Sequence, residues 1–123
     1  MGLQISIRES ADVTILALQG RVTIGVDSEL LNVHLKKLVA QRVRKLLLNL
    51  EDVTQLDSLA ISAVVGTYVS LARQGGSLKL VCPSGRVQDV LRVIHVADFI
   101  ATFEDETQAL ASFRREGNAA RPR

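Results

Sequence analysis

The sequence predicts a single α/β domain with a mixed sheet of four to five strands, about four helices and an N-terminal hairpin. A chain of 123 residues has the usual length of one domain. Apolar residues at 4–8 and 13–19 predict two strands joined across Ser10-Ala11-Asp12. After this hairpin, helical and strand patterns alternate, which is typical of helices packed on a parallel or mixed sheet. Apolar residues make up 47% of the chain and aromatic residues only 3%, so we expect an aliphatic core.

A first helix and a central strand follow the hairpin. Gly20 ends the second strand, and Asp27-Ser28 predicts the cap of the helix. The apolar face of this helix consists of Leu31, Leu35, Leu38 and Val39. The continuous apolar run 45–50 is typical of a strand covered on both faces. We expect a polar loop, residues 51–58, to lead from this strand into the second helix.

The second half of the chain repeats the alternation. Gln74-Gly75-Gly76 predicts the end of the second helix, and residues 78–81 predict the next strand. A third helix is expected from Ser84, with Val87, Val90, Leu91 and Ile94 on its core side, followed by a short apolar segment at 100–103. The last helix starts at Asp105, with Gln108 three residues on as in a capping box, and buries Ala109, Leu110 and Phe113. No pattern continues from Glu116, so we expect a domain at 1–115 and a disordered basic tail at 116–123.

The composition excludes several classes of function. The formal charge of +2 comes from arginines after residue 113, and no aromatic residues interleave with them, so we expect a solvated tail and no nucleic-acid contact. The single cysteine, Cys82, cannot form an internal disulfide, and no His or Cys cluster has metal-ligand spacing, so we expect neither a metal nor another cofactor. The chain has no signal-peptide pattern and no segment of the ~20 apolar residues that cross a bilayer. We therefore expect a cytoplasmic protein without membrane insertion.

The second helix has two contrasting faces. At 100° per residue, one face collects the apolar residues Ile61, Val64, Val65, Tyr68 and Ala72, and we expect it to face the core. The opposite face collects small or polar residues and one leucine, namely Leu59, Ser62, Ala63, Gly66 and Ser70. Glycine inside a helix costs about 0.5–1 kcal/mol relative to alanine. Gly66 therefore indicates either the close approach of a partner chain, with Leu59 as an anchor, or packing under a neighbouring loop without further function.

Ser58 opens this helix, and two interpretations of it remain open. A serine at this position can cap the helix, which needs no further purpose. It can also accept a phosphate, beside the acidic residues Glu51, Asp52 and Asp57. A catalytic serine would need a base, but His34 fits the apolar arc of the first helix and His95 fits the end of the third. We therefore expect the protein not to be an enzyme.

The pattern resembles the STAS domain, and specifically the bacterial anti-sigma-factor antagonists. The resemblance covers residues 3–113 and is carried by the order of elements, by Gly20, by the run 48–53 (Leu-Asn-Leu-Glu-Asp-Val), by the Leu56-Asp57-Ser58 turn, by Gln74-Gly75-Gly76, by the strand 78–81 and by the final helix with Ala109-Leu110. The Asp-Ser turn is its most specific part.

The resemblance implies a partner-switching protein. Its unphosphorylated form would bind an anti-sigma factor that is also a serine kinase, and phosphorylation of Ser58 would end that binding. Asp57 would be the oriented neighbour of Ser58, and the docking face would consist of Leu59, Ser62, Ala63 and Gly66. The alternative is a constitutive STAS subunit of a transporter or scaffold, in which Ser58 is only a cap. A homodimer is a further open arrangement.

Overall fold

The computed structural model describes residues 3–22, 26–83 and 85–119. Its strands are β1 (Gln4–Ser10), β2 (Val13–Val22), β3 (Lys45–Leu56), β4 (Ser77–Val81) and β5 (Thr102–Phe103). Its α-helices are α1 (Val26–Ala40), α2 (Ser58–Arg73), α3 (Arg86–Val93) and α4 (Glu106–Ala119), with a short 3₁₀ helix η1 (Val96–Asp98) between α3 and β5. The expected helix start at Ser84 lies outside the described residues, and α3 begins at Arg86.

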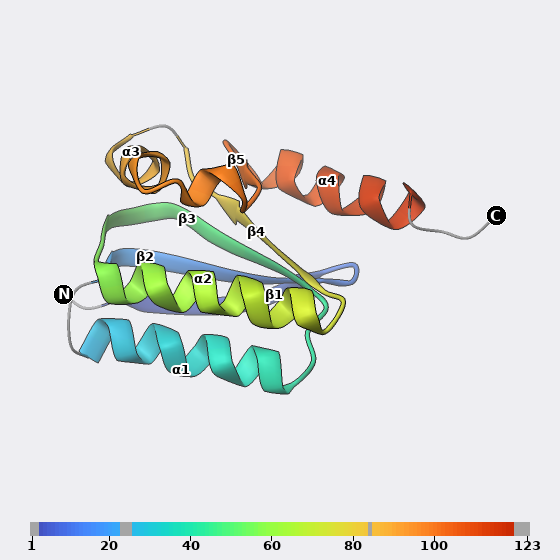
Figure 1. Cartoon of the computed structure of the whole chain (residues 1–123), viewed down its shortest axis with the longest axis horizontal. Coiled ribbons are helices and arrows are strands. Elements are labelled where there is room, and N and C mark those ends of the chain that lie inside the picture. Colours follow the sequence, from blue (N-terminus) through green and yellow to red (C-terminus); the bar gives the residue numbers. More distant parts are fainter. Residues whose placement is uncertain (1–2, 23–25, 84, 120–123) are drawn as a thin grey trace.

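The strands form one mixed sheet in the order β1-β2-β3-β4-β5. β1 and β2 are an antiparallel hairpin, and every later neighbour is parallel. Figure 1 shows α1 and α2 side by side along one face of the sheet and α4 on the other. The predicted fold class, a single α/β domain with a mixed sheet and an N-terminal hairpin, is confirmed. Among the described residues, none of the helices has the length and apolar character needed to span a bilayer.

The apolar residues of the central strand supply both faces of the sheet, as the run 45–50 predicts. Leu46 and Leu48 belong to the larger cluster beneath α1, α2 and α3, while Leu47 belongs to a smaller cluster beneath α4. The smaller cluster consists of Val13, Ile15, Leu47, Val81, Ala109 and Phe113. The fold therefore buries two aliphatic layers, and Phe113 is the one fully buried aromatic residue in the described part of the chain.

The third strand is longer than the sequence predicts. β3 continues through Glu51 and Asp52 to Leu56, and it pairs with β2 as far as Val22. The expectation of a loop over residues 51–58 is therefore wrong. The polar side chains of this stretch are mostly exposed, but the pairing with β2 continues along it with two register shifts, each of which places one extra residue on β3. Backbone pairing, which the side-chain pattern does not reveal, keeps the segment extended.

Two apolar positions of α3 also differ from expectation. Val87 and Leu91 are buried against the core as predicted. Val90 and Ile94, which we expected beside them, are 38% and 44% exposed. α3 is only eight residues long and buries only Val87 and Leu91, so the apolar arc expected from the sequence is wider than the buried face of the helix.

The final helix starts as predicted and ends later. The Asp105 carboxylate accepts a hydrogen bond from the Gln108 amide (2.9 Å) and so caps α4. The expected disordered segment is wrong for residues 116–119, because α4 runs to Ala119 and the Glu116 carboxylate lies 2.8 Å from the Lys79 ammonium. Residues 120–123 of the predicted tail lie outside the described residues.

Lys79 ties α4 to the sheet from a buried position. It stands in the middle of β4, only 3% exposed, where a charge is costly unless it is paired and hydrogen-bonded. Its ammonium donates to Ser112, pairs with Glu116 and lies 4.6 Å from the Phe113 ring centroid. All three partners belong to α4, so one lysine fixes the register of the helix on the sheet.

A second polar contact joins α4 to the hairpin. Arg8 of β1 donates to the Glu106 carboxylate (2.5 Å), and the Asn49 amide of β3 donates to the same oxygen (2.9 Å). The hydrogen bond from Arg8 lowers the pKa of Glu106 below its usual value, against the effect of burial and with help from Asn49. The ionised carboxylate thus stabilises the folded state.

Glu106→Gln should weaken the acid sensitivity of the fold. Because the pKa of Glu106 is lower in the folded protein, its contribution is present above the unfolded-state pKa of about 4.3 and is lost as the pH falls through the folded-state pKa. The glutamine variant should lose less stability between neutral and acid pH, by no more than about 1 kcal/mol for a partly exposed pair. Urea unfolding at several pH values measures this. Arg8→Gln should also flatten the curve, and a Glu106→Gln curve parallel to wild type would contradict the assignment.

Candidate docking site at the start of α2

The turn between β3 and α2 consists of Asp57 alone, held between two elements. Its backbone N–H donates to the carbonyl of Val22 at the end of β2 (3.0 Å). Its extended conformation (φ −87°, ψ 175°) turns the side chain over the first turn of α2, where the carboxylate accepts from the Ala60 amide (2.8 Å). Asp57, and not Ser58 as one interpretation of the sequence held, is therefore the N-cap of this helix.

The same carboxylate joins α2 to α1. The Ser28 hydroxyl lies 2.9 and 2.8 Å from the two oxygens of Asp57, and Ser28 is 4% exposed. The expectation that Ser28 belongs to the cap of the first helix is wrong, since α1 already begins at Val26. Ser28 instead directs its hydroxyl across to the neighbouring helix. The starts of both helices are thus fixed by one acidic side chain.

Ser58 is the first residue of α2 and is exposed. Asp57 serves as the cap, and no other side chain in the described part of the chain hydrogen-bonds the Ser58 hydroxyl. The position lies at the positive end of the helix dipole, next to amide groups that lack helical partners. A hydroxyl placed in this way is available to an external group, and a negative charge added to it would be well tolerated by the helix.

The two acidic residues expected beside Ser58 lie elsewhere. Glu51 and Asp52 belong to the middle of β3, and Asp52 pairs in register with Gln19. At about 3.3 Å per strand residue, Asp52 is roughly 16 Å from Asp57 along the strand. The prediction of an acidic loop around the serine is therefore wrong, and the carboxylate that the turn itself supplies is Asp57.

The face of α2 that we expect to dock a partner is open. Leu59 is 55% exposed, Ser62 and Gly66 are exposed, and Ala63 is half-buried. No described atom lies within 4 Å of a Cβ built on Gly66, so packing under a neighbouring loop does not explain this glycine. The exposed stripe continues to Val69, which is 40% exposed.

A groove runs beside this stripe, between α1 and α2. It has a volume of about 260 Å³ and is lined by Asn32, Lys36 and Val39 of α1 and by Ser62, Ala63, Gly66, Thr67 and Ser70 of α2. Spacing along one helix does not show which residues of the next helix lie opposite, so the α1 wall of the groove was not predicted from the sequence. For the same reason Ser28 was expected only as a cap of its own helix and not as a partner of Asp57.

The buried side of α2 is rotated relative to the prediction. Ala60, Val64, Thr67 and Leu71 are buried, whereas Ile61, Val65 and Tyr68 are half-buried and Ala72 is exposed. Ala60 and Thr67 are only weakly apolar, so a face predicted from the larger apolar side chains does not include them. Ala60 points inward, which leaves Leu59 as the side chain next to Ser58 on the open surface.

The remaining reactive side chains lie outside this site. His34 Nδ1 is 2.9 Å from the Leu30 carbonyl in its own helix, and His95 contacts Asp98, so neither ring is bonded to Ser58. Burial raises the pKa of Cys82 to about 11, which makes it a poor nucleophile. Within residues 3–22, 26–83 and 85–119, no three His, Cys, Asp or Glu side chains gather as a metal site.

The sheet order, the helix layers and the turn at Asp57 define a small α/β domain, and sequence comparison identifies its family. The family model of the STAS domain matches residues 4–109, so this chain belongs to the STAS domain family. The predicted resemblance is thereby confirmed.

Two relatives from Thermotoga are named as candidate anti-sigma factor antagonists. The T. maritima protein is 28% identical over 72 residues, which cover 58% of this chain and 64% of that protein. The T. neapolitana protein is 32% identical over 66 residues, covering 54% and 58%. The matched segments thus span less than two thirds of either relative.

Solved structures agree on the fold. An anti-sigma factor antagonist from Mycobacterium paratuberculosis superposes with a TM-score of 0.85 at 17% identity, covering 92% of this chain and 95% of that one. The antagonist SpoIIAA in its unphosphorylated form gives 0.70 at 16% identity, with 93% and 98% covered. The phosphorylated form of SpoIIAA from Bacillus also gives 0.70 at 16% identity, with 89% and 99% covered.

Asp57→Ala should lower the free energy of unfolding by about 1–3 kcal/mol, because it removes the cap of α2 and the acceptor that Ser28 has in Asp57. Asp57→Asn should cost less, since an amide oxygen can still accept from Ala60. Urea denaturation measures both. Ser28→Ala combined with Asp57→Ala should cost less than the two single changes added together. Strict additivity would show that the link between the helices has no energetic weight.

Proposed function

We propose that this protein is an anti-sigma factor antagonist of the cytoplasm, whose binding to an anti-sigma factor kinase is switched off by phosphorylation of Ser58. The observation that carries the proposal is the exposed Ser58 hydroxyl at the start of α2, directly beside the open stripe of Leu59, Ser62 and Gly66. The names of the Thermotoga and Mycobacterium relatives support the same role.

Capping and phosphorylation would fall on two different residues of this turn, Asp57 and Ser58. Asp57 supplies the cap, so the Ser58 hydroxyl can be esterified without removing a hydrogen bond on which the fold depends. A phosphate would add about −1.5 to −2 charge units and three acceptor oxygens at the N-terminus of α2, where amide groups and the helix dipole favour negative charge. The folded state should therefore survive phosphorylation.

The docking surface would change much more than the fold. Leu59 and Gly66 offer apolar area and close approach, and a partner resting on them would cover the adjacent Ser58. A dianion at that place must be desolvated or must meet a matching cation, and each 1.4 kcal/mol of unmatched cost lowers affinity tenfold. The phosphate would thus dissociate the complex while leaving the protein intact.

Phosphorylation at Ser58 can be read directly. The chain is incubated with ATP and each anti-sigma factor kinase of the same genome, and intact mass is measured. Wild type should gain the mass of one phosphate group, Ser58→Ala should gain none, and Ser6→Ala on the opposite side of the sheet should behave as wild type. Equal labelling of wild type and Ser58→Ala would reject the switch.

Binding separates the switch from a permanent STAS subunit. Ser58→Asp should weaken binding to the anti-sigma factor at least tenfold, whereas Ser6→Asp, with the same added charge on the far face, should leave it unchanged. Calorimetry measures both. A subunit that uses the same face constitutively would bind equally well with Ser58→Asp, because Ser58 carries no signal there.

Gly66 tests the docking face in either case. Gly66→Arg should abolish binding, because a long side chain would stand where the partner approaches. Gly66→Ala is the matched control: it should retain binding and stabilise α2 by about 0.5–1 kcal/mol. Thermal unfolding of both variants checks that the fold is kept. Undiminished binding by Gly66→Arg would place the docking surface elsewhere.

A further inference from the structure

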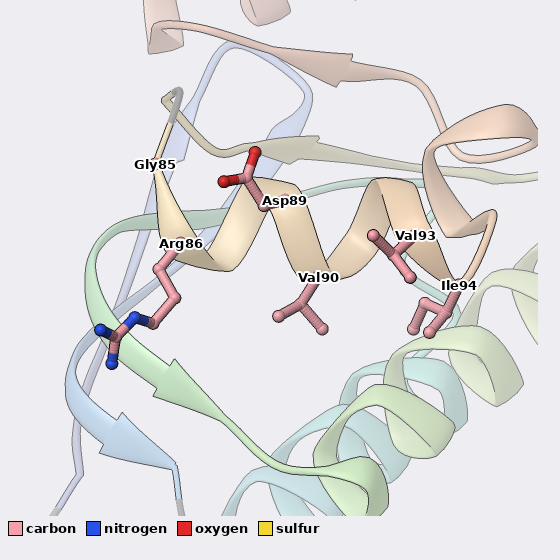
Figure 2. Close-up of a pocket in the computed structure, with 6 residues that line it drawn as sticks. All are labelled: Gly85, Arg86, Asp89, Val90, Val93 and Ile94. Carbon is pink, nitrogen blue, oxygen red and sulfur yellow. The ribbon is translucent and has the colours of Figure 1, made fainter.

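The groove between α1 and α2 carries charge of one sign. Of the described residues that line it, Lys36 of α1 is the charged one, and the others are small, polar or aliphatic. The larger hollow on α3, drawn in Figure 2, is different, because both Arg86 and Asp89 line it. Opposite charges favour no particular partner there, whereas a cation alone in the α1–α2 groove favours an anionic partner.

The ammonium of Lys36 has no acidic partner within its own chain. Lys36 is exposed and forms no ion pair with any residue of 3–22, 26–83 or 85–119. The facing helix adds no acid, since the one charged residue of α2 is the cation Arg73 in its last turn. Glu29 lies on the same edge of α1, but it is seven residues before Lys36, about 10 Å along the helix. The middle of the groove is therefore electropositive.

Other polar groups of the groove can bind the same anion. The Ser62 and Ser70 hydroxyls and the Asn32 amide line the groove and make no hydrogen bond with another described residue, whereas Thr67 donates to a carbonyl of its own helix. Gly66 leaves the α2 wall without a side chain, so a group from outside can enter between the helices. A carboxylate fits in about 260 Å³ and would meet the ammonium from α1 and hydroxyls from α2.

We propose that Lys36 is a specificity-determining residue for the anti-sigma factor, which inserts the carboxylate of an aspartate or glutamate into the α1–α2 groove. This inference rests on the proposed function, because Ser62 and Gly66 belong both to the open stripe and to the groove. A partner that covers the stripe therefore reaches Lys36. The ion pair selects against kinases that carry a neutral or basic residue at the matching position.

The exposure of the groove favours a side chain of a docked protein over a free small anion. A free carboxylate or phosphate would gain an ion pair that is open to water and screened by salt, which contributes little. A carboxylate carried by the anti-sigma factor loses no separate translational freedom, because the rest of the interface already holds it in place. The partner also excludes water from the groove, which strengthens the ion pair.

Calorimetry with the anti-sigma factor tests the role of Lys36. Lys36→Glu should weaken binding at least tenfold, because it brings like charges together, and Lys36→Gln should weaken it less. Lys36→Arg should bind nearly as wild type, since it keeps the charge. Lys37→Glu is the matched control: Lys37 is the next residue of α1 and is also exposed, but it does not line the groove. Its binding should equal that of wild type, and thermal unfolding should show that all four variants keep the fold.

The role of Lys36 and the docking face can fail separately. If Lys36→Glu binds as wild type does while Ser58→Asp and Gly66→Arg are weakened, the docking face stands and the role of Lys36 is overturned. Equal weakening by Lys36→Glu and Lys37→Glu would also overturn it, because the effect would then belong to the general charge of α1. Self-association of the chain that is lost in Lys36→Glu would assign the groove to a second copy instead. A wild type that binds no anti-sigma factor of its genome would overturn both proposals.

Discussion

The carboxylate of Asp57 is the interaction on which this architecture depends. It caps α2 through the Ala60 amide and receives the hydroxyl of the buried Ser28 in α1, while its own backbone N–H binds the end of β2. Sheet, first helix and second helix therefore meet at one residue. Because the cap is supplied from here, the next residue in the chain needs no structural role, and its hydroxyl is left to the surface.

The global fold was predictable because its signals are local and repeated. The apolar alternation of the hairpin, the continuous run 45–50 and the cap at Asp105 each specify an element from a few neighbouring residues. The length of β3 was not predictable in this way. Residues 51–55 are polar and exposed apart from Val53, and only the ladder to β2, with its two register shifts, keeps them extended. Such pairing belongs to the tertiary structure.

The candidate site was predictable along one helix but not between helices. The spacing of Leu59, Ser62 and Gly66 placed them on one exposed stripe, as the structure has them. Asp57 and Ser58 are equally good caps by residue type, so only the backbone geometry could assign the cap. Ser28 and the groove wall of α1 belong to a contact between segments about thirty residues apart. On α3, Val90 and Ile94 were expected in the core because helical spacing does not show how much of an apolar arc the sheet covers.

The contacts of Lys79 with Ser112, Phe113 and Glu116 have a practical consequence for shortening this protein. A recombinant form that stops at residue 115, where sequence pattern fades, would discard the carboxylate of Glu116 and leave the ammonium under α4 with the Ser112 hydroxyl and the aromatic rings. The apolar periodicity does not reveal this ion pair, since Glu116 lies 37 positions after Lys79 in the chain. The low stability of such a shortened protein would then reflect an unpaired buried ammonium and not the stability of the intact domain. The natural place to end a minimal domain is beyond the last turn of α4.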